Sequence, residues 1–189
     1  SATRLAPTSS SDDMLILALD PAVRTGYAFG RTGGSEPLRS GAVRLKKPDE
    51  DLDVMLKNIA CFLRDQVLTF AKPDLCVIEH WMSPQAQKSG QAVIYQLTLH
   101  GAIIAVLAPH GVRTERVHVG TWRKHFTGSG NAGERDATKL MTLRRAKQLA
   151  YLPHDCTDTD RADACGIWDY AAAHYGRATS ANWTFFGAR

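Results

Sequence analysis

Short apolar segments of strand length alternate along this chain with longer segments of helical periodicity. Five of the short segments predict β-strands, at Met14–Leu19, Thr25–Arg31, Leu38–Leu45, Leu75–Ile78 and Val112–Val119. A turn signal, Thr32-Gly33-Gly34-Ser35, separates the second segment from the third. These two strands are therefore predicted to form an antiparallel hairpin or meander.

The longer segments predict helices. Apolar residues recur at three- and four-residue spacing over Glu50–Phe70, and the stretch Ser89–Leu107 is long and mostly apolar. Further helices are predicted at Asp136–Ala150 and Asp160–Tyr175, with a short helical turn at Trp122–Phe126. Antiparallel strands followed by alternating strands and helices predict an α/β fold, a mixed sheet flanked by helices.

Length and composition indicate one globular domain. The chain has 189 residues, of which 44% are hydrophobic and 22% charged, which excludes a wholly disordered chain, a coiled coil and a collagen-like fibre. We expect the domain to span residues 14–176, between a flexible lead at 1–13 and a tail at 177–189.

The apolar stretch Ala92–Ala108 is interrupted by Gln96, Thr98 and His100, and its longest clean run, Gly101–Ala108, is far shorter than the roughly 20 residues of a membrane span. We therefore expect no membrane partner. The N-terminal residues lack the apolar segment of a secretory signal, and the 4 cysteines form no C-x-x-C pair. A reducing compartment such as the cytoplasm is therefore expected.

Positive charge is concentrated in one segment. The chain carries a net charge of +4, but the segment from Arg113 to Lys147 holds nine basic and three acidic residues, and so carries +6. A basic surface on an otherwise near-neutral body indicates a polyanionic partner, above all nucleic acid. A solvated helix face explains the same charges equally well.

Four carboxylates occur where a sheet fold can bring them together. Asp20 and Glu79 end two predicted core strands, and Asp160 and Asp163 lie one helical turn apart at the start of the last helix. Converging carboxylates repel one another unless a cation lies among them, and all-oxygen ligands suit Mg²⁺ or Mn²⁺. Two such ions support in-line hydrolysis of a phosphodiester.

Three motifs in this order resemble those of the RuvC family of Holliday-junction resolvases, within the RNase H-like nucleases. The first is Leu17-Ala18-Leu19-Asp20-Pro21 leading to Thr25-Gly26-Tyr27-Ala28, the second Pro73-Asp74-Leu75-Cys76-Val77-Ile78-Glu79, and the third Asp160-Arg161-Ala162-Asp163-Ala164. The resemblance covers about residues 14–175, and the segment Trp122–Phe126 is more similar to phage or prophage members. It implies an RNase H-like five-stranded sheet and a homodimer.

The resemblance also assigns roles to individual residues. It implies that Asp20, Glu79, Asp160 and Asp163 hold two Mg²⁺ or Mn²⁺ ions and that Lys124 is a phosphate-contacting or catalytic lysine. Asp158 is an alternative to Asp160 as the ligand at the helix start. A second basic residue is expected near the start of the following helix, either Arg135 or Lys139, and the DNA contacts are expected from Arg123, Lys124, Arg135 and Lys139.

The sequence therefore predicts a metal-dependent, dimeric endonuclease that cleaves branched DNA, most simply a four-way junction. Two other functions remain as alternatives. One is an ATPase or phosphotransferase of the actin-like fold, which also begins with a strand-end Asp and a Gly-Thr turn. The other is a junction-binding protein without catalysis, against which the intact carboxylate set argues.

Overall fold

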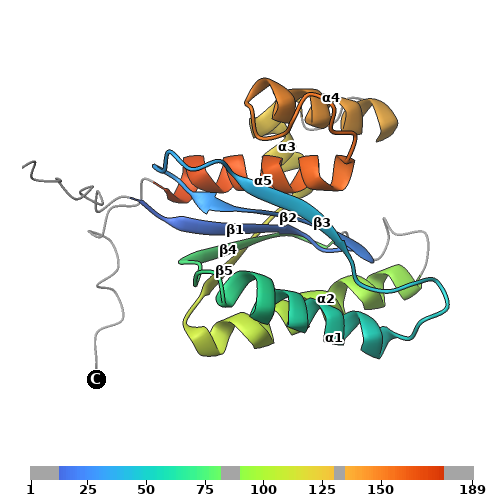
Figure 1. The fold of residues 1–189 in the computed structure, drawn as a ribbon. Coiled ribbons are helices and arrows are strands. Elements are labelled where there is room, and N and C mark those ends of the chain that lie inside the picture. The colour runs from blue at the N-terminus through green and yellow to red at the C-terminus, as the bar shows by residue number, and fades with distance from the viewer. Residues whose placement is uncertain (1–12, 82–89, 130–134, 177–189) are drawn as a thin grey trace, which may run out of the picture.

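A single mixed sheet of five strands forms the centre of the molecule (Figure 1). This computed structural model describes residues 13–81, 90–129 and 135–176. The strands are β1 (Leu15–Asp20), β2 (Arg24–Arg31), β3 (Arg39–Arg44), β4 (Leu75–Glu79) and β5 (Arg113–Val117), in the spatial order β3-β2-β1-β4-β5. The first three are antiparallel neighbours, whereas β1, β4 and β5 run parallel. The predicted mixed sheet and its hairpin are confirmed.

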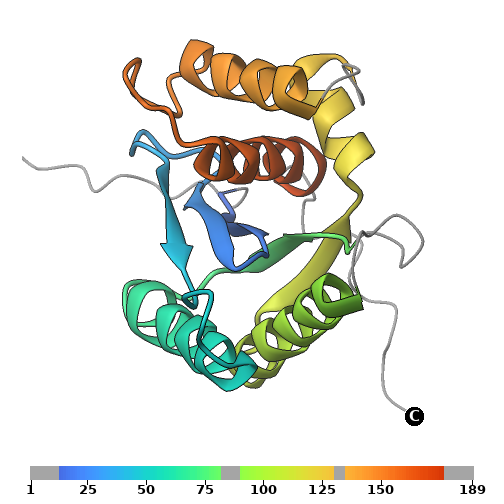
Figure 2. The same cartoon turned by 90° about the vertical axis from the view of Figure 1, so that its right-hand side faces the viewer.

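Helices cover both faces of this sheet (Figure 2). On one face lie α1 (Leu52–Phe62) and α2 (Gly90–Leu107), and on the other lies α5 (Thr159–Tyr175). The helices α3 (Val119–Thr127) and α4 (Arg135–Gln148) pack against α5. The fold is therefore layered, and α5 is held between the sheet and an outer pair of helices.

The central strand β1 is buried on both faces, which explains its unbroken apolar sequence. Ile16 and Ala18 join the core beneath α5, while Leu15, Leu17 and Leu19 join the core beneath α1 and α2. Asp20 is the last residue of this strand and directly follows its five buried residues. This placement is what makes the end of β1 chemically distinctive.

Several predicted boundaries shift in the structure. The expected helix Glu50–Phe70 is α1 followed by a π-helical segment, Leu63–Leu68. The expected strand Val112–Val119 ends at Val117, because His118 is already the N-cap of α3. This helix extends to Thr127, where Gly128 ends it in the left-handed conformation with φ of 80°.

The helix α2 has a high mean hydropathy despite its polar residues. The segment Gly90–His110 is long and apolar enough to cross a membrane by length and composition, with a mean hydropathy of 1.7 and 22% of it buried. The polar residues therefore do not lower the hydropathy of the segment below that of a membrane span, and two of them have hydrogen-bond partners within the protein. Thr98 donates to the carbonyl of Ile94, and the His100 ring contacts the carbonyls of Gln96 and Glu79.

Candidate active site

Two carboxylates lie side by side at the ends of neighbouring parallel strands. Asp20 ends β1 and Glu79 ends β4, and the register pairs Leu19 with Ile78 immediately before them. Burial raises the pKa of Asp20 well above its ordinary value, and the negative charges of Glu79, Asp163 and Asp160 raise it further. The negative charges of the other three predicted carboxylates thus act on Asp20, while their role as metal ligands stays a prediction.

The start of α5 brings the other two carboxylates to the same edge of the sheet. Asp163 is only 3% exposed, and burial raises its pKa. Close packing with β2 requires Gly26, which pairs with Asp20 across the sheet. A Cβ at Gly26 would lie 2.1 Å from the carbonyl oxygen of Asp160. The glycine of the first motif thus lets α5 approach the end of β1.

Glu79 is anchored by a tryptophan from α3. The indole Nε1 of Trp122 donates a hydrogen bond of 2.7 Å to Oε2 of Glu79. Burial raises the pKa of Glu79 to about 7, although this hydrogen bond and the charge of Arg123 oppose the rise. Gly166 on α5 makes room for the indole, because a Cβ there would lie 2.6 Å from a ring carbon.

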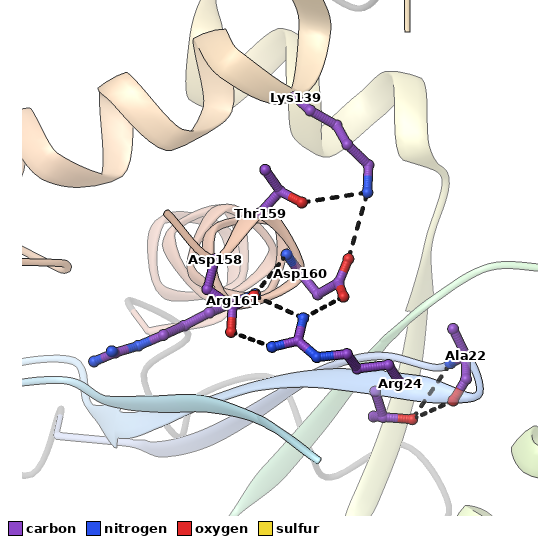
Figure 3. Close-up of polar contacts among 8 residues, drawn as sticks. Ala22, Arg24, Lys139, Asp158, Thr159, Asp160 and Arg161 are labelled. Carbon is purple, nitrogen blue, oxygen red and sulfur yellow. Dashed lines mark hydrogen bonds and ion pairs between the residues drawn. The ribbon is translucent and has the colours of Figure 1, made fainter. Parts of the chain in front are cut away.

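Three cationic side chains pair with the acidic residues. Nη2 of Arg123 donates to Oδ2 of Asp163 at 3.3 Å, and Nζ of Lys139 donates to Oδ1 of Asp160 at 3.4 Å. Figure 3 shows Lys139 reaching Asp160 from α4, while Arg24 reaches it from β2 with an N–O distance of 2.5 Å. The negative charge of this edge is thus partly neutralised by the chain itself.

Asp158 has a different structural role from the other acidic residues. Its side chain caps α5 by accepting from the backbone N–H groups of Asp160 and Arg161, and it pairs with Nη2 of Arg24 at 2.5 Å (Figure 3). These contacts hold the pKa of Asp158 below its ordinary value. Asp158 is therefore engaged in fixing the start of the helix, which favours Asp160 as the residue that faces the site.

The donor set fits a hard divalent cation. It consists of carboxylate oxygens, and Oδ1 of Asp163 is buried with no hydrogen-bond partner among the described residues. Within residues 13–81, 90–129 and 135–176, however, no three His, Cys, Asp or Glu side chains are arranged to hold a metal ion as they stand. The carboxylates are neighbours, but Arg123, Lys139 and Arg24 hold Asp163 and Asp160 in ion pairs.

Not every predicted site residue reaches this edge. Lys124 is exposed and lines a separate hollow of about 400 Å³ with His125, Tyr170 and His174. The structure therefore places Arg123, and not Lys124, at the carboxylates. Of the two alternatives on α4, Lys139 contacts Asp160, whereas the side chain of Arg135 lies outside the described residues.

Two contacts at the site have little signature in the sequence. The hydrogen bond from Trp122 to Glu79 depends on how α3 packs over α5, which no local pattern encodes. The ion pairs of Arg24 join residues more than 130 positions apart. Only the proximity of Arg24 to Asp20 in sequence could have suggested its place at this edge.

No protein-family model and no curated protein matches the sequence. Solved structures do match the fold. RuvC of Thermus thermophilus in complex with a Holliday junction substrate superposes with a TM-score of 0.64 at 18% identity, covering 85% of this chain and 96% of that one. The chain has the RuvC fold.

Two further structures agree with this assignment. A second structure of Thermus thermophilus RuvC has a TM-score of 0.59 at 16% identity, with the same 85% and 96% coverage. The yeast mitochondrial Holliday junction resolvase Ydc2 has a TM-score of 0.56 at 11% identity, covering 85% of this chain and 81% of that one. The resemblance in the three sequence motifs thus extends to the RuvC fold over most of the domain.

Proposed function

We propose that this chain is a metal-dependent endonuclease that hydrolyses phosphodiester bonds in branched DNA, in the first place Holliday junctions, in the cytoplasm of a bacterial or phage-infected cell. The observation that carries the proposal is the meeting of Asp20 and Glu79, at two adjacent strand ends, with the buried Asp163 of α5. Such a cluster is costly to build and has no stabilising role of its own. The likeness to resolvase structures supports branched DNA as the substrate.

Asp20, Glu79, Asp163 and Asp160 would hold two Mg²⁺ or Mn²⁺ ions. When bound, such ions stabilise the charge that develops on the attacking and leaving oxygens. The chain's own part is to fix the ligands: Trp122 orients Glu79, and the close approach of the α5 backbone to Gly26 of β2 sets the distance between Asp163 and Asp20. Water attacks phosphorus and gives up a proton, the bond from phosphorus to a sugar oxygen breaks, and that oxygen takes up a proton as it leaves as a hydroxyl.

Basic side chains around the carboxylates are suited to hold the DNA backbone. Lys139 and Arg123 already stand beside Asp160 and Asp163, where they can pair with the scissile phosphate. Lys124 lies on the exposed side of α3, and we propose that it contacts phosphates of a DNA arm away from the reacting bond. Arg135, at the first position of α4, is proposed as a further DNA contact.

A homodimer is proposed through the outward face of α2. Ile94 is 53% exposed and Leu97 45%, and Gly101 and Ala105 continue the exposed stripe along the same helix. Nothing among the described residues would meet a Cβ at Gly101, so a second copy could approach this helix closely. An exposed apolar stripe of this kind is typical of a subunit interface, and a two-fold dimer would present two active sites to a junction.

The proposal is tested with a labelled immobile four-way junction, a matched linear duplex and a three-way fork, each with Mg²⁺, Mn²⁺ or EDTA. We expect symmetric paired nicks in the four-way junction that disappear in EDTA. Cutting of all branched forms would broaden the substrate to branched DNA in general. Binding without cutting under every metal would contradict the catalytic proposal, and nucleotide hydrolysis in place of DNA cleavage would favour a phosphotransferase.

A further inference from the structure

Arg123 pairs with one of the carboxylates that we propose as metal ligands and acts through its charge on another. Its Nη2 donates to Oδ2 of Asp163 at 3.3 Å, and its positive charge also acts on Glu79. The two partners are well shielded from water, since the side chain of Arg123 is 20% exposed and that of Asp163 is 5% exposed. The guanidinium carbon lies 5.0 Å from the ring centroid of Trp122, the residue that orients Glu79.

The pair between Arg123 and Asp163 is incomplete. Nε of Arg123 and Oδ1 of Asp163 are both buried, and neither has a hydrogen-bond partner among the described residues. A permanent arginine–carboxylate pair in such a place is usually bidentate and uses these atoms. A buried polar atom without a partner costs about 1–3 kcal/mol. The arrangement is therefore poor as a fixed structural ion pair, and its open oxygen is a ligand atom for a cation.

We propose that Arg123 is a displaceable counter-cation, which pairs with Asp163 while the site contains no metal ion and releases it when a divalent ion binds. This inference rests on the proposed function, because it requires the carboxylates to be metal ligands. It adds that the metal ion and Arg123 compete for the carboxylate of Asp163.

The competition follows from charge and space. A divalent ion at the open Oδ1 of Asp163 would lie on the same small carboxylate whose Oδ2 accepts from Nη2 of Arg123, so the two cations would be brought close together. Two like charges within about 4 Å repel strongly in a partly dehydrated site. Without any cation, the carboxylates repel one another. Arg123 should therefore stabilise the metal-free protein and weaken metal binding, two effects of opposite direction.

The experiment compares the full-length wild type with the variants R123Q and R123K. Isothermal titration with Mn²⁺ and Mg²⁺ measures metal affinity, and thermal unfolding in EDTA and in saturating Mn²⁺ measures stability. The matched control is R161Q, which removes an arginine beside Asp160 whose Nε donates to Ser40 and not to a carboxylate. R123K keeps the charge with a smaller head group, and it serves as the test if R123Q does not fold.

We expect R123Q to bind Mn²⁺ about fivefold or more tightly than the wild type, which is at the lower end of typical coupling between two ligands. Its melting temperature should be lower than that of the wild type in EDTA, and the deficit should shrink in saturating Mn²⁺. R123K should lie between the two proteins, and R161Q should bind Mn²⁺ as the wild type does.

Two failures are distinguishable. If the wild type binds Mn²⁺ and R123Q binds it equally or more weakly, Arg123 is not a competitor of the metal and the inference is overturned, while the proposed metal site stands. If neither protein binds Mn²⁺ or Mg²⁺, the metal site itself is contradicted, and the inference falls with it.

Discussion

Replacing Gly26 with alanine tests how closely α5 must approach the sheet. The new Cβ would lie 2.1 Å from the carbonyl oxygen of Asp160 and 2.7 Å from its carbonyl carbon. Ordinary contacts begin near 3.4 Å, and both neighbours are backbone atoms, so the start of α5 must move away by about 1 Å or more. Asp160 and Asp163 would move with it.

Two magnitudes follow from this displacement. Overpacking a well-packed interior costs about 1–3 kcal/mol, which lowers the melting temperature of a domain of this size by about 2–4 °C for each kcal/mol. A catalytic group misplaced by about 1 Å can lose about 100-fold in rate. We therefore expect G26A to remain folded, with a modest loss of stability and a much larger loss of junction cleavage.

The assays are thermal unfolding and the initial rate of nicking of a labelled four-way junction. The control is G120A, at a glycine of α3 where nothing lies within 4 Å of an added Cβ. It should cleave like the wild type and be at least as stable, because alanine favours a helix over glycine. Wild-type cleavage by G26A, together with wild-type stability, would refute the close packing of α5 on β2 as the device that positions the carboxylates.

Three further predictions follow from the site and from α2. Because the pKa of Glu79 is raised from 4.5 to about 7, the folded protein binds the proton of this carboxyl group more tightly than the unfolded chain does. The free energy of unfolding in EDTA should therefore fall as pH rises from about 5 to 8. E79Q should reduce this fall by up to about 3 kcal/mol. W122F keeps an aromatic ring but removes the donor to Glu79 and leaves space beside Gly166, so metal-free stability should fall by about 1 kcal/mol or more. The acidic limb of the cleavage profile should move to higher pH, and an unchanged profile would exclude a role for this hydrogen bond. L97E places a charge on the exposed stripe of α2 and should convert the proposed dimer to a monomer in light scattering, whereas a wild type that is already monomeric would contradict this interface.

The strands could be predicted because β1 and β4 are buried on both faces and therefore appear as unbroken apolar runs. The carboxylates could be predicted for the same reason, since Asp20 and Glu79 are the first charged residues after those runs. Local pattern and strand-end position were sufficient for this part of the site.

The basic residues could not be assigned from sequence because their direction depends on how the outer helices pack. Arg123 and Lys124 are neighbours in the chain, yet successive residues of a helix point about 100° apart. Packing of Trp122 against Gly166 turns Arg123 toward Asp163 and leaves Lys124 exposed on another side. The contact of Lys139 with Asp160 likewise depends on the docking of α4 against α5.

The central claim is that the carboxylate cluster at the ends of β1 and β4 cleaves branched DNA. The most direct test compares D20N with the wild type on the same four-way junction in Mg²⁺, measuring binding and nicking in parallel. A matched control is D65N, at an exposed aspartate paired only with its neighbour Arg64 among the described contacts. We predict that D20N binds the junction and does not nick it, while D65N does both. Nicking by D20N at the wild-type rate would contradict the account.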